Sequence, residues 1–249
     1  MDDRELKGRV ALVTGAAKNI GRAIALALAS GGASVMVAAR GSRIEAEETV
    51  SLIRSQGGEA FMHLADLTDP DEAKGLIDAS IDRFGALDIV VNNAALRADN
   101  PVSAIAYDEW RRVVSSILDA TFLCTQAALP HLRRSDAPSV VTIGGVAAHA
   151  GVAQRVHVAA AKAGVAGLTR ALAAELAGEG ITVNCISPGY IETARKGHLP
   201  EHFRIRPVPL GRPGRPEEVA AMARYLAGPS ARFITGQIMH VNGGWHMGS

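Results

Sequence analysis

The chain has few cysteines, almost no net charge and no long uninterrupted apolar run. Its two cysteines, Cys124 and Cys185, lie in apolar segments without metal-ligand spacing, so we predict buried free thiols and no metal site. A formal net charge of +1 provides no concentrated basic face, so we expect no nucleic-acid partner. The longest uncharged stretch, Ala23 to Ala39, is interrupted by Gly31 and Gly32 and is typical of helix, turn and strand, not of a membrane span.

The first residues, Met1–Lys7, are charged along their length and do not resemble a signal peptide, so we expect a cytoplasmic protein that does not enter membranes. With 249 residues, of which 48% are hydrophobic, the chain can bury a sizeable core. We find no internal repeat, low-complexity tract or linker. The sequence therefore predicts one domain over residues 1–249.

The chain opens with a short apolar run, a glycine-bearing turn and an amphipathic helix. The run is Arg9–Val13 and the turn is Thr14–Gly21, and a second strand at Ser34–Ala38 would complete a βαβ unit. Such a unit offers a helix N-terminus to a pyrophosphate. Asn19 stands where a glycine would be usual, and because asparagine tolerates a left-handed backbone well, we expect the turn to form.

Short apolar runs alternate with helical patterns along the rest of the chain. This alternation predicts an α/β fold of the doubly wound (Rossmann) type, with parallel strands and helices on both faces. Its site would lie beyond the carboxyl ends of the strands, near the switch in strand order. Further strands are expected at Glu59–Leu64, Leu87–Val91, Ser139–Ile143, Ile181–Ile186 and Gln237–Val241, and helices at Ser42–Ser55, Pro70–Phe84, Tyr107–Leu132, Gly151–Ala177 and Pro216–Ala227.

A segment at about 192–215 is rich in Arg, His, Gly and Pro, and we predict that it forms a loop-like lid over the substrate. Its basic residues either cap an anionic substrate or simply face solvent. These residues are Arg195, Lys196, His198, Arg204 and Arg206.

Several separate motifs, in the right order from about Lys7 to Trp245, resemble those of the short-chain dehydrogenase/reductase family. They are the phosphate turn Thr14–Gly21, the adenine-contacting pair Asp66-Leu67, the strand end Asn92–Ala95 (with alanine for the family's final glycine), the nicotinamide-side segment Ser187–Thr193, and the C-terminal Ile234–Gln237 with Val241–Gly244. The resemblance implies a nicotinamide dinucleotide cofactor, a small-molecule substrate and a homo-oligomer, either dimer or tetramer. The cofactor-binding residues that it implies are Gly15, Ala17, Lys18, Asn19, Ile20, Gly21, Arg40, Asp66, Leu67, Asn93, Lys162, Pro188, Gly189, Ile191 and Thr193.

No carboxylate follows the second expected strand, where the sequence reads Ala38-Ala39-Arg40-Gly41-Ser42-Arg43. An acidic residue there would bind a ribose 2′-hydroxyl and repel a 2′-phosphate. Arg40 can instead stack on adenine or pair with the 2′-phosphate, and Lys18 adds a second positive charge. The charges therefore favour NADP(H) over NAD(H), although Arg40 and Arg43 can also be solvated residues of a surface helix.

Most of the family's proton-transfer residues are missing. In the family, a tyrosine donates the proton and a serine hydrogen-bonds the substrate oxygen. A lysine binds the ribose and lowers the pKa of the tyrosine, and an asparagine holds a water that relays the proton. When the chain is aligned on Lys162, the tyrosine position is Val158, the asparagine position is Ile117, and the serine position is Gly144 or Gly145. None of these replacements donates a proton. Ordinary ketone reduction by the family's mechanism is therefore expected to be nearly absent.

Three interpretations remain open. In the first, the protein reduces a substrate that needs little proton donation, such as a pre-protonated imine or an activated double bond. In the second, it is a catalytically inactive NADP(H)-binding sensor or partner subunit. In the third, it has lost the cofactor. The intact cofactor motifs argue against the last. Pro188 and Gly189 on the nicotinamide side favour an enzyme, because a mere binder needs only the adenine half.

A histidine is the candidate replacement acid, because its pKa range suits proton transfer. His149 follows the strand that carries Gly145, in an expected loop, and is our candidate beside Lys162, although a plain surface histidine is the simpler interpretation. His157 precedes Val158, and adjacent helical side chains point about 100° apart, so we expect it to face elsewhere.

Overall fold

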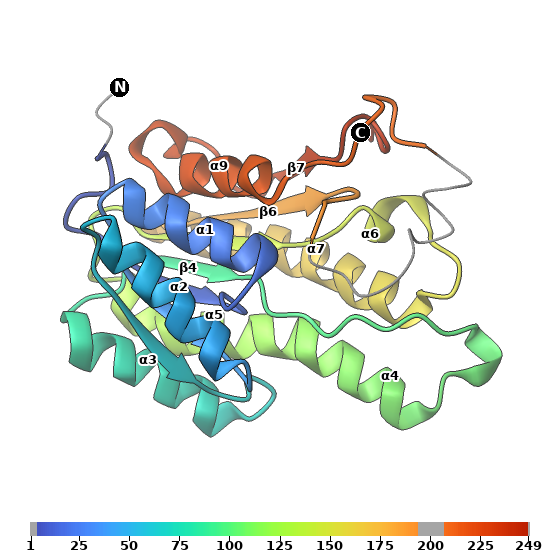
Figure 1. The fold of residues 1–249 in the computed structure, drawn as a ribbon, viewed down its shortest axis with the longest axis horizontal. Coiled ribbons are helices and arrows are strands. Elements are labelled where there is room, and N and C mark those ends of the chain that lie inside the picture. The colour runs from blue at the N-terminus through green and yellow to red at the C-terminus, as the bar shows by residue number, and fades with distance from the viewer. Residues whose placement is uncertain (1–3, 194–206, 249) are drawn as a thin grey trace.

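The computed structural model describes residues 4–193 and 207–248, which form one parallel sheet with helices on both faces (Figure 1). The sheet has seven strands in the order β3-β2-β1-β4-β5-β6-β7, so the doubly wound prediction is confirmed. The order reverses between β1 and β4, the neighbours at the switch point. The strands are β1 Val10–Thr14, β2 Ser34–Ala39, β3 Ala60–Leu64, β4 Ile89–Asn92, β5 Ser139–Ile143, β6 Thr182–Pro188 and β7 Ile238–Val241.

The four central strands consist almost wholly of buried residues. Every residue of β1, β4, β5 and β6 is buried, whereas β3 and β7, at the two edges, are only partly covered. A parallel sheet with helices on both faces has no solvated face, so its inner strands read as continuous apolar runs, not as alternating ones. This is why the short Val- and Ile-rich runs predicted the strands.

The main helices divide between the two faces of the sheet (Figure 1). α1, α2 and α9 share one apolar core with the sheet, and α1 packs directly on α9. α3, α5 and the end of α7 contribute to the core on the other face. The helices are α1 Asn19–Ser30, α2 Arg43–Ser55, α3 Pro70–Phe84, α4 Tyr107–Val114, α5 Ala120–Leu132, α6 Ala147–Ala150, α7 Val156–Leu176 and α9 Pro216–Ala227, with short 3₁₀ turns at Val102–Ala104, Ala177–Glu179 and Pro229–Ala231.

The ends of α3 show how closely local chemistry fixes a helix boundary. The Asp69 carboxylate accepts hydrogen bonds from the backbone N–H groups of Asp71 and Glu72, and Pro70 occupies the first turn. Gly85, with φ +78°, closes the other end in the left-handed conformation. An aspartate cap, an early proline and a C-terminal glycine are all readable from sequence, and the predicted bounds agree with the structure.

The segment predicted as one long helix at Tyr107–Leu132 is interrupted. Five residues, Ser115–Asp119, form a π-helical segment, η2, between α4 and α5. The hydroxyl of Thr121 donates to the carbonyl oxygen of Ile117 at 2.6 Å, inside this segment. π-bulges occur mostly at functional sites, and this one carries Ile117. Hydrophobic periodicity does not report a single-turn change of hydrogen-bond pattern, so the prediction missed it.

The segment between β5 and α7 also differs from the prediction. α7 begins at Val156 and not at Gly151, and residues Ala147–Ala150 form the separate short helix α6. The break follows from the backbone of Gly151 and Gln154, both in the left-handed region with φ +61° and +64°. His149 therefore lies in a helical turn and not in the loop predicted for it.

The α4–η2–α5 run, Tyr107–Leu132, is long and apolar enough by composition to cross a membrane. Its described contacts are those of a core helix of this fold: α5 packs against α3 and β4, and α4 and η2 pack against α7. Buried residues along it, such as Val113, Ile117 and Cys124, belong to the apolar cores. It gives no evidence of a membrane span.

Because α1 lies close to the strand ends, a single methyl group added at Gly21 should have a large effect on stability. A Cβ at Gly21 would lie 2.2 Å from the carbonyl oxygen of Gly15 and 2.5 Å from the side-chain nitrogen of Asn93. Gly21→Ala should therefore lower the free energy of unfolding by about 1–3 kcal/mol or more, measured by urea denaturation without cofactor.

The matched control is Gly75→Ala in α3, where a Cβ meets nothing within 4 Å. This substitution should raise stability by about 0.5–1 kcal/mol through helix propensity and a less flexible unfolded chain. Equal stabilities of the two variants would contradict the close packing of Gly21.

Candidate functional site

The turn between β1 and α1 adopts the backbone expected of a phosphate-binding loop. Gly15 and Asn19 have φ values of +63° and +53°, both in the left-handed region. The prediction that asparagine can replace glycine at position 19 is therefore confirmed. α1 begins at Asn19, so its N-terminal backbone N–H groups open onto the cleft that Lys18, Asn19 and Ile20 line.

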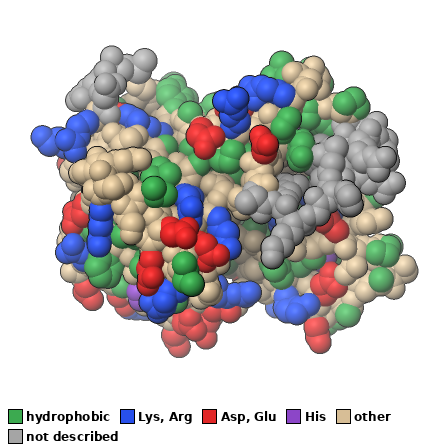
Figure 2. All heavy atoms as spheres, in the orientation of Figure 1, with side chains coloured by type: hydrophobic (Ala, Val, Ile, Leu, Met, Phe, Trp, Pro, Cys, Tyr) green, Lys and Arg blue, Asp and Glu red, His purple; other side chains and the backbone are tan. Residues whose placement is uncertain are grey.

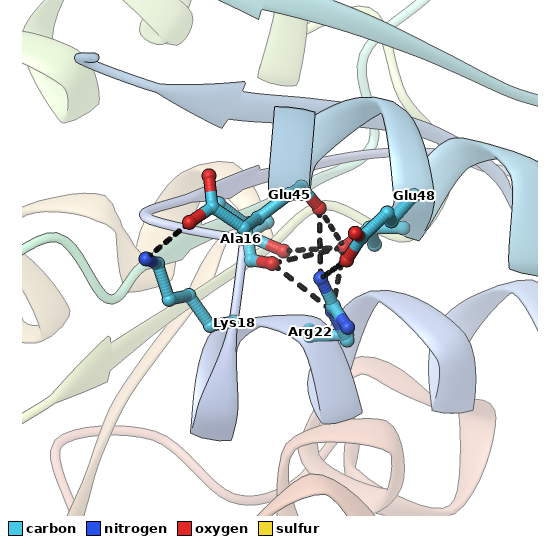
Figure 3. Close-up of polar contacts among 7 residues, drawn as sticks. Ala16, Lys18, Arg22, Glu45 and Glu48 are labelled. Atoms are coloured by element: carbon cyan, nitrogen blue, oxygen red, sulfur yellow. Dashed lines mark hydrogen bonds and ion pairs between the residues drawn. The ribbon is translucent and has the colours of Figure 1, made fainter. Parts of the chain in front are cut away.

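The carbonyl oxygens of this turn are engaged on the side away from that cleft (Figure 3). The Thr49 hydroxyl of α2 lies 3.3 Å and 3.2 Å from the carbonyl oxygens of Ala16 and Ala17. The Arg22 guanidinium donates to the Ala17 carbonyl at 3.0 Å, to Thr49 at 2.9 Å and to Glu48 at 3.0 Å. These bonds satisfy acceptors that would otherwise repel a bound anion.

The other wall of the turn is held by Asn93 and Thr14. The Asn93 side chain donates to the carbonyl oxygens of Thr14 and Gly15 at 2.9 Å and 3.1 Å. The Thr14 hydroxyl accepts the backbone N–H groups of Asn93 and Ala94 at 2.9 Å and 3.0 Å. Asn93, implied by resemblance as a cofactor contact, thus also fixes the glycine turn to the end of β4.

A small cleft of about 180 Å³ opens beside the ends of β2 and β3. Arg40, Asp66 and Leu67 line it, as the resemblance implied. A guanidinium nitrogen of Arg40 lies 3.6 Å from the Asp66 carboxylate. Burial raises the pKa of Asp66, but hydrogen bonds from Thr68 and the charge of Arg40 outweigh it and hold the pKa below its usual value. The geometry suits an adenosine, with Arg40 at its rim.

Lys18 is paired with a carboxylate that sequence reasoning did not consider. Its ammonium lies 2.6 Å from Glu45 of α2 (Figure 3). The hydrogen bond from Lys18 lowers the pKa of Glu45. Glu45 therefore already compensates the positive charge of Lys18, which we had expected to attract a 2′-phosphate. The preference for NADP(H) consequently depends more on Arg40 than on Lys18.

A larger cleft, of about 410 Å³, continues from the glycine turn toward α7. Gly15 and Ala94–Leu96 line both clefts, so the two adjoin along the carboxyl ends of the central strands. Together they fit an extended dinucleotide, with the α1 N-terminus between its halves. Neither Ala17 nor Thr193 lines either cleft. The implied cofactor residues that do line the larger one are Gly15, Lys18, Asn19, Ile20, Gly21, Asn93, Lys162, Pro188, Gly189 and Ile191.

Lys162 is buried at the inner end of this larger cleft. Its ammonium donates to the carbonyl oxygen of Ile143, at the end of β5, at 2.5 Å. Burial lowers the pKa of Lys162 to about 8, the nearby Cys185 opposes this effect, and the charge of Arg97 adds to it. A buried lysine without a carboxylate partner is costly to fold, and such groups concentrate at functional sites.

The wall next to Lys162 carries no donor side chain at the three positions where the family has one. Ile117, Gly145 and Val158 all line the larger cleft. Ile117 and Val158 belong to an apolar cluster with Val113, and both are buried. This part of the cleft wall is therefore apolar.

The structure distinguishes the two glycines that stand in the serine register. A Cβ at Gly144 would lie 2.7 Å from the sulfur of Cys185, whereas a Cβ at Gly145 meets nothing within 4 Å. Only position 145 thus has room for a side chain that faces the cleft. The thiol that blocks position 144 is buried and free, like that of Cys124, and burial raises the pKa values of both, for Cys124 to about 12. The prediction of buried free thiols is confirmed.

Two arginines at the substrate end were missed from the sequence. Arg97 and Arg155 both line the larger cleft. Arg155 forms a two-point ion pair with Asp99, one contact measuring 2.9 Å. Arg97 lies two residues after the Asn92–Ala95 motif, and this proximity is the signal that could have indicated it. Both guanidiniums are permanent cations beside an otherwise apolar wall.

The two histidines considered as acids lie apart from the cleft. His157 is fully buried, and its ring nitrogen lies 3.1 Å from a Glu109 carboxylate of α4, so it faces away from the site as expected. His149 does not line either cleft. Its ring packs against those of His240 and His246. Burial, then the neighbouring rings, lowers the pKa of His149.

The predicted lid, at about 192–215, lies largely outside the described residues. So do its basic residues, all between positions 194 and 206. Its described part after residue 206 approaches the C-terminal segment, where the backbone N–H of Leu210 donates to Gly243 at 3.1 Å. On the face shown in Figure 2, Lys and Arg side chains are interspersed with Asp and Glu, and no single-sign patch stands out.

Comparison with known proteins supports the reading of this site. A family model described as enoyl-(acyl carrier protein) reductase matches residues 15–246. A 3-oxoacyl-(acyl-carrier-protein) reductase of Staphylococcus aureus is 38% identical over 240 residues, which cover 95% of this chain and 98% of the relative. A short-chain dehydrogenase/reductase of Serratia marcescens has a similar structure, with a TM-score of 0.91 and 32% identity over 97% of this chain and 99% of the other.

A further solved structure adds a ligand to the comparison. A short-chain dehydrogenase of Burkholderia cenocepacia, solved in complex with NADP, superimposes with a TM-score of 0.92 at 32% identity, again over 97% of this chain and 99% of the other. These matches extend over nearly the whole chain. The chain belongs to the short-chain dehydrogenase/reductase family.

Proposed function

We propose that this protein is an NADP(H)-binding oxidoreductase that reduces a small organic substrate without the family's tyrosine and serine. One observation carries the proposal. Most residues that the resemblance implies for the cofactor line the two clefts, while Ile117, Gly145 and Val158, which line the larger one, carry no donor side chain.

The preference for NADP(H) rests on charge at the adenosine cleft. Arg40 follows β2, and no carboxylate stands at the end of that strand. The carboxylate nearest to its guanidinium, Asp66, lies 3.6 Å away and is partly exposed, so the guanidinium can turn to a 2′-phosphate. The Burkholderia relative, which was solved with NADP, supports this choice.

The bound cofactor would supply or accept a hydride at its nicotinamide. The chain's own residues then have defined tasks: the α1 N-terminus and the Lys162 ammonium hold the phosphates and ribose, and the apolar wall around Val158 excludes water. Because Val158 has no proton to give, the acceptor must already be electrophilic. A pre-protonated imine needs only the hydride, whereas the carbanion left by hydride addition to an activated double bond would take its proton from solvent. Arg97 and Arg155 can stabilise developing negative charge there but cannot protonate it.

The curated relatives are named as reductases of 3-oxoacyl groups on acyl carrier protein, a ketone reduction. Because that chemistry needs a proton at the carbonyl oxygen, we do not transfer it unchanged to this chain. The alternative function is an inactive NADP(H)-binding sensor or partner subunit, with which the absence of a donor at Val158 and Gly145 is also compatible. We retain His149 only as a candidate acid.

We further expect a single cytoplasmic domain that forms a homo-oligomer and has a lid over the substrate.

The cofactor preference can be measured by thermal shift. NADPH should raise the melting temperature more than NADH, and at about 100 times Kd the stabilisation should reach ~2.7 kcal/mol. Arg40→Leu should remove the difference between the two cofactors. Arg43→Leu is the matched control, since Arg43 pairs with Glu47 on α2 and does not line the clefts. Equal shifts by NADPH and NADH in the unmodified protein would argue against the role of Arg40.

The proton and hydrogen-bond donors that are absent from positions 145 and 158 can be introduced by substitution. The double variant Val158→Tyr with Gly145→Ser should gain NADPH-dependent reduction of a simple ketone by about 10²–10⁴-fold over the unmodified protein. The control combines Val158→Tyr with Gly144→Ser, whose side chain would collide with Cys185, 2.7 Å from the new Cβ. Activity is followed by NADPH oxidation at saturating cofactor.

The same assay on imines and enones separates the two proposed functions. Turnover of either by the unmodified protein supports the oxidoreductase. An unmodified protein that binds NADPH but is inert, and that becomes active only as the double variant, is the sensor or partner subunit. Ketone turnover by the unmodified protein at the rate of the double variant would contradict both readings.

Burial of Lys162 predicts a pH dependence of stability. Its pKa of about 8 in the folded cofactor-free protein lies below that of an unfolded lysine, roughly 10.4. The unfolded state therefore binds more protons between these values, and stability rises with pH across this window. Relative to Lys162→Met, the unmodified protein should gain about 1–3 kcal/mol between pH 7 and 10 in urea denaturation. Lys74→Met, at an exposed lysine of α3, should show no such change; a pH-independent difference for Lys162→Met would refute the burial argument.

A further inference from the structure

Three histidines from separate segments lie together at the carboxyl end of the sheet, outside the cofactor clefts. His149 comes from α6, His240 from β7 and His246 from the C-terminal segment. Their ring centroids lie 4.9 Å apart for His149 and His240, 5.3 Å for His149 and His246, and 4.9 Å for His240 and His246. One ring nitrogen of each lies within 4.8 Å of the others.

The surroundings of these rings leave their nitrogens available. Among the described residues, no carboxylate, hydroxyl or backbone group hydrogen-bonds to any of the three rings. The Nδ1 atom of His240 is buried and has no partner in this described part of the chain. A buried ring nitrogen without a partner is unfavourable unless a ligand satisfies it. Two of the three ring pairs meet edge to face, and His149 stacks on His246; imidazoles this close repel one another once protonated.

We propose that His149, His240 and His246 bind one divalent transition-metal ion, with Zn²⁺ as the expected ion. Neutral imidazole nitrogens suit zinc, copper or nickel, whereas magnesium and calcium require oxygen ligands. Zinc–nitrogen bonds of about 2.0–2.1 Å place the ligand atoms roughly 3.3 Å apart. Small rotations of the soft imidazole torsions bring the nitrogens, now within 4.8 Å, to that separation. Three histidine ligands leave at least one coordination position for water.

The position of this cluster indicates what the ion would hold in place. Val146, Val152 and Trp245 form a small buried apolar group that links the α6 region to the C-terminal segment. Val146 and Val152 also line the larger cofactor cleft. A metal ion on His149 and His246 would therefore cross-link the C-terminal segment to the wall of the cleft. Metal binding does not require the hydride chemistry proposed above, but a bound ion would occupy the His149 ring and exclude it as the candidate acid.

Metal binding can be tested with zinc chloride on protein that carries no polyhistidine tag and has been stripped with EDTA. We expect one Zn²⁺ per chain, measured by competition with a chromophoric chelator, and a higher melting temperature with zinc. Substitution of Co²⁺ should give the visible absorption bands of a tetrahedral site. The variants His149→Ala, His240→Ala and His246→Ala should each weaken affinity by more than about 100-fold, because loss of even an outer partner typically costs 10–100-fold.

The matched control is His63→Ala, because His63 lies on β3, at the opposite edge of the sheet from β7. It should bind zinc like the unmodified protein. Far-UV circular dichroism checks the fold of each variant, and the Gln substitutions at the same positions replace any Ala variant that does not fold. Zinc bound at less than one per chain by the unmodified protein, or equal affinity in the three cluster variants and His63→Ala, would overturn the proposal.

Discussion

The cofactor site depends on the hydrogen bonds that join the carboxyl ends of β1 and β4. The Thr14 hydroxyl accepts two backbone N–H groups, from Asn93 and Ala94, and lies 3.3 Å from the carbonyl oxygen of Val91, to which it donates. The Asn93 side chain returns two bonds to the backbone of the glycine turn. Both side chains use nearly all of their hydrogen-bonding capacity on the frame, so the turn is held before any ligand arrives.

The carboxyl end of the neighbouring strand β5 positions Lys162, whose burial lowers the stability of the folded protein. A buried ammonium that donates a hydrogen bond to a backbone carbonyl, that of Ile143, destabilises the cofactor-free protein. The rigid ends of β5 and α7 hold it in that position, at the inner end of the cleft. This cost is consistent with our proposal that the ammonium binds the phosphates and ribose hydroxyls of a dinucleotide.

Much of the fold could be predicted, because its determinants are local or periodic. The strands follow from continuous apolar runs, the bounds of α3 follow from Asp69, Pro70 and Gly85, and the turn at Asn19 follows from the conformational tolerance of asparagine. The π-helical segment at Ser115–Asp119 was missed, because a shift of hydrogen-bond pattern leaves the residue pattern unchanged.

The site was less predictable, because its pairings join distant segments. The ion pair of Lys18 with Glu45 bridges α1 and α2, and nothing in the sequence marks Glu45 as the partner of a turn residue. The cluster of His149, His240 and His246 likewise requires the positions of α6 and the C-terminal segment to be known. Arg97 and Arg155 share a cleft only because the end of β4 and the start of α7 meet there.

The contrast between the two ends of the cleft bears on whether the protein still catalyses a reaction. In a protein that had only lost its activity, nothing would maintain a shaped pocket at this end of the cleft. Here the space at Gly145 is open, and Ile117 and Val158 pack closely in the wall beside it. Two guanidiniums, of Arg97 and Arg155, face this apolar wall, and one of them is positioned by Asp99. An apolar recess with fixed positive charge at its edge is selective for a substrate of matching shape and charge. A passive dinucleotide binder has no use for that selectivity, and for this reason we favour an enzyme of altered chemistry over an inactive one.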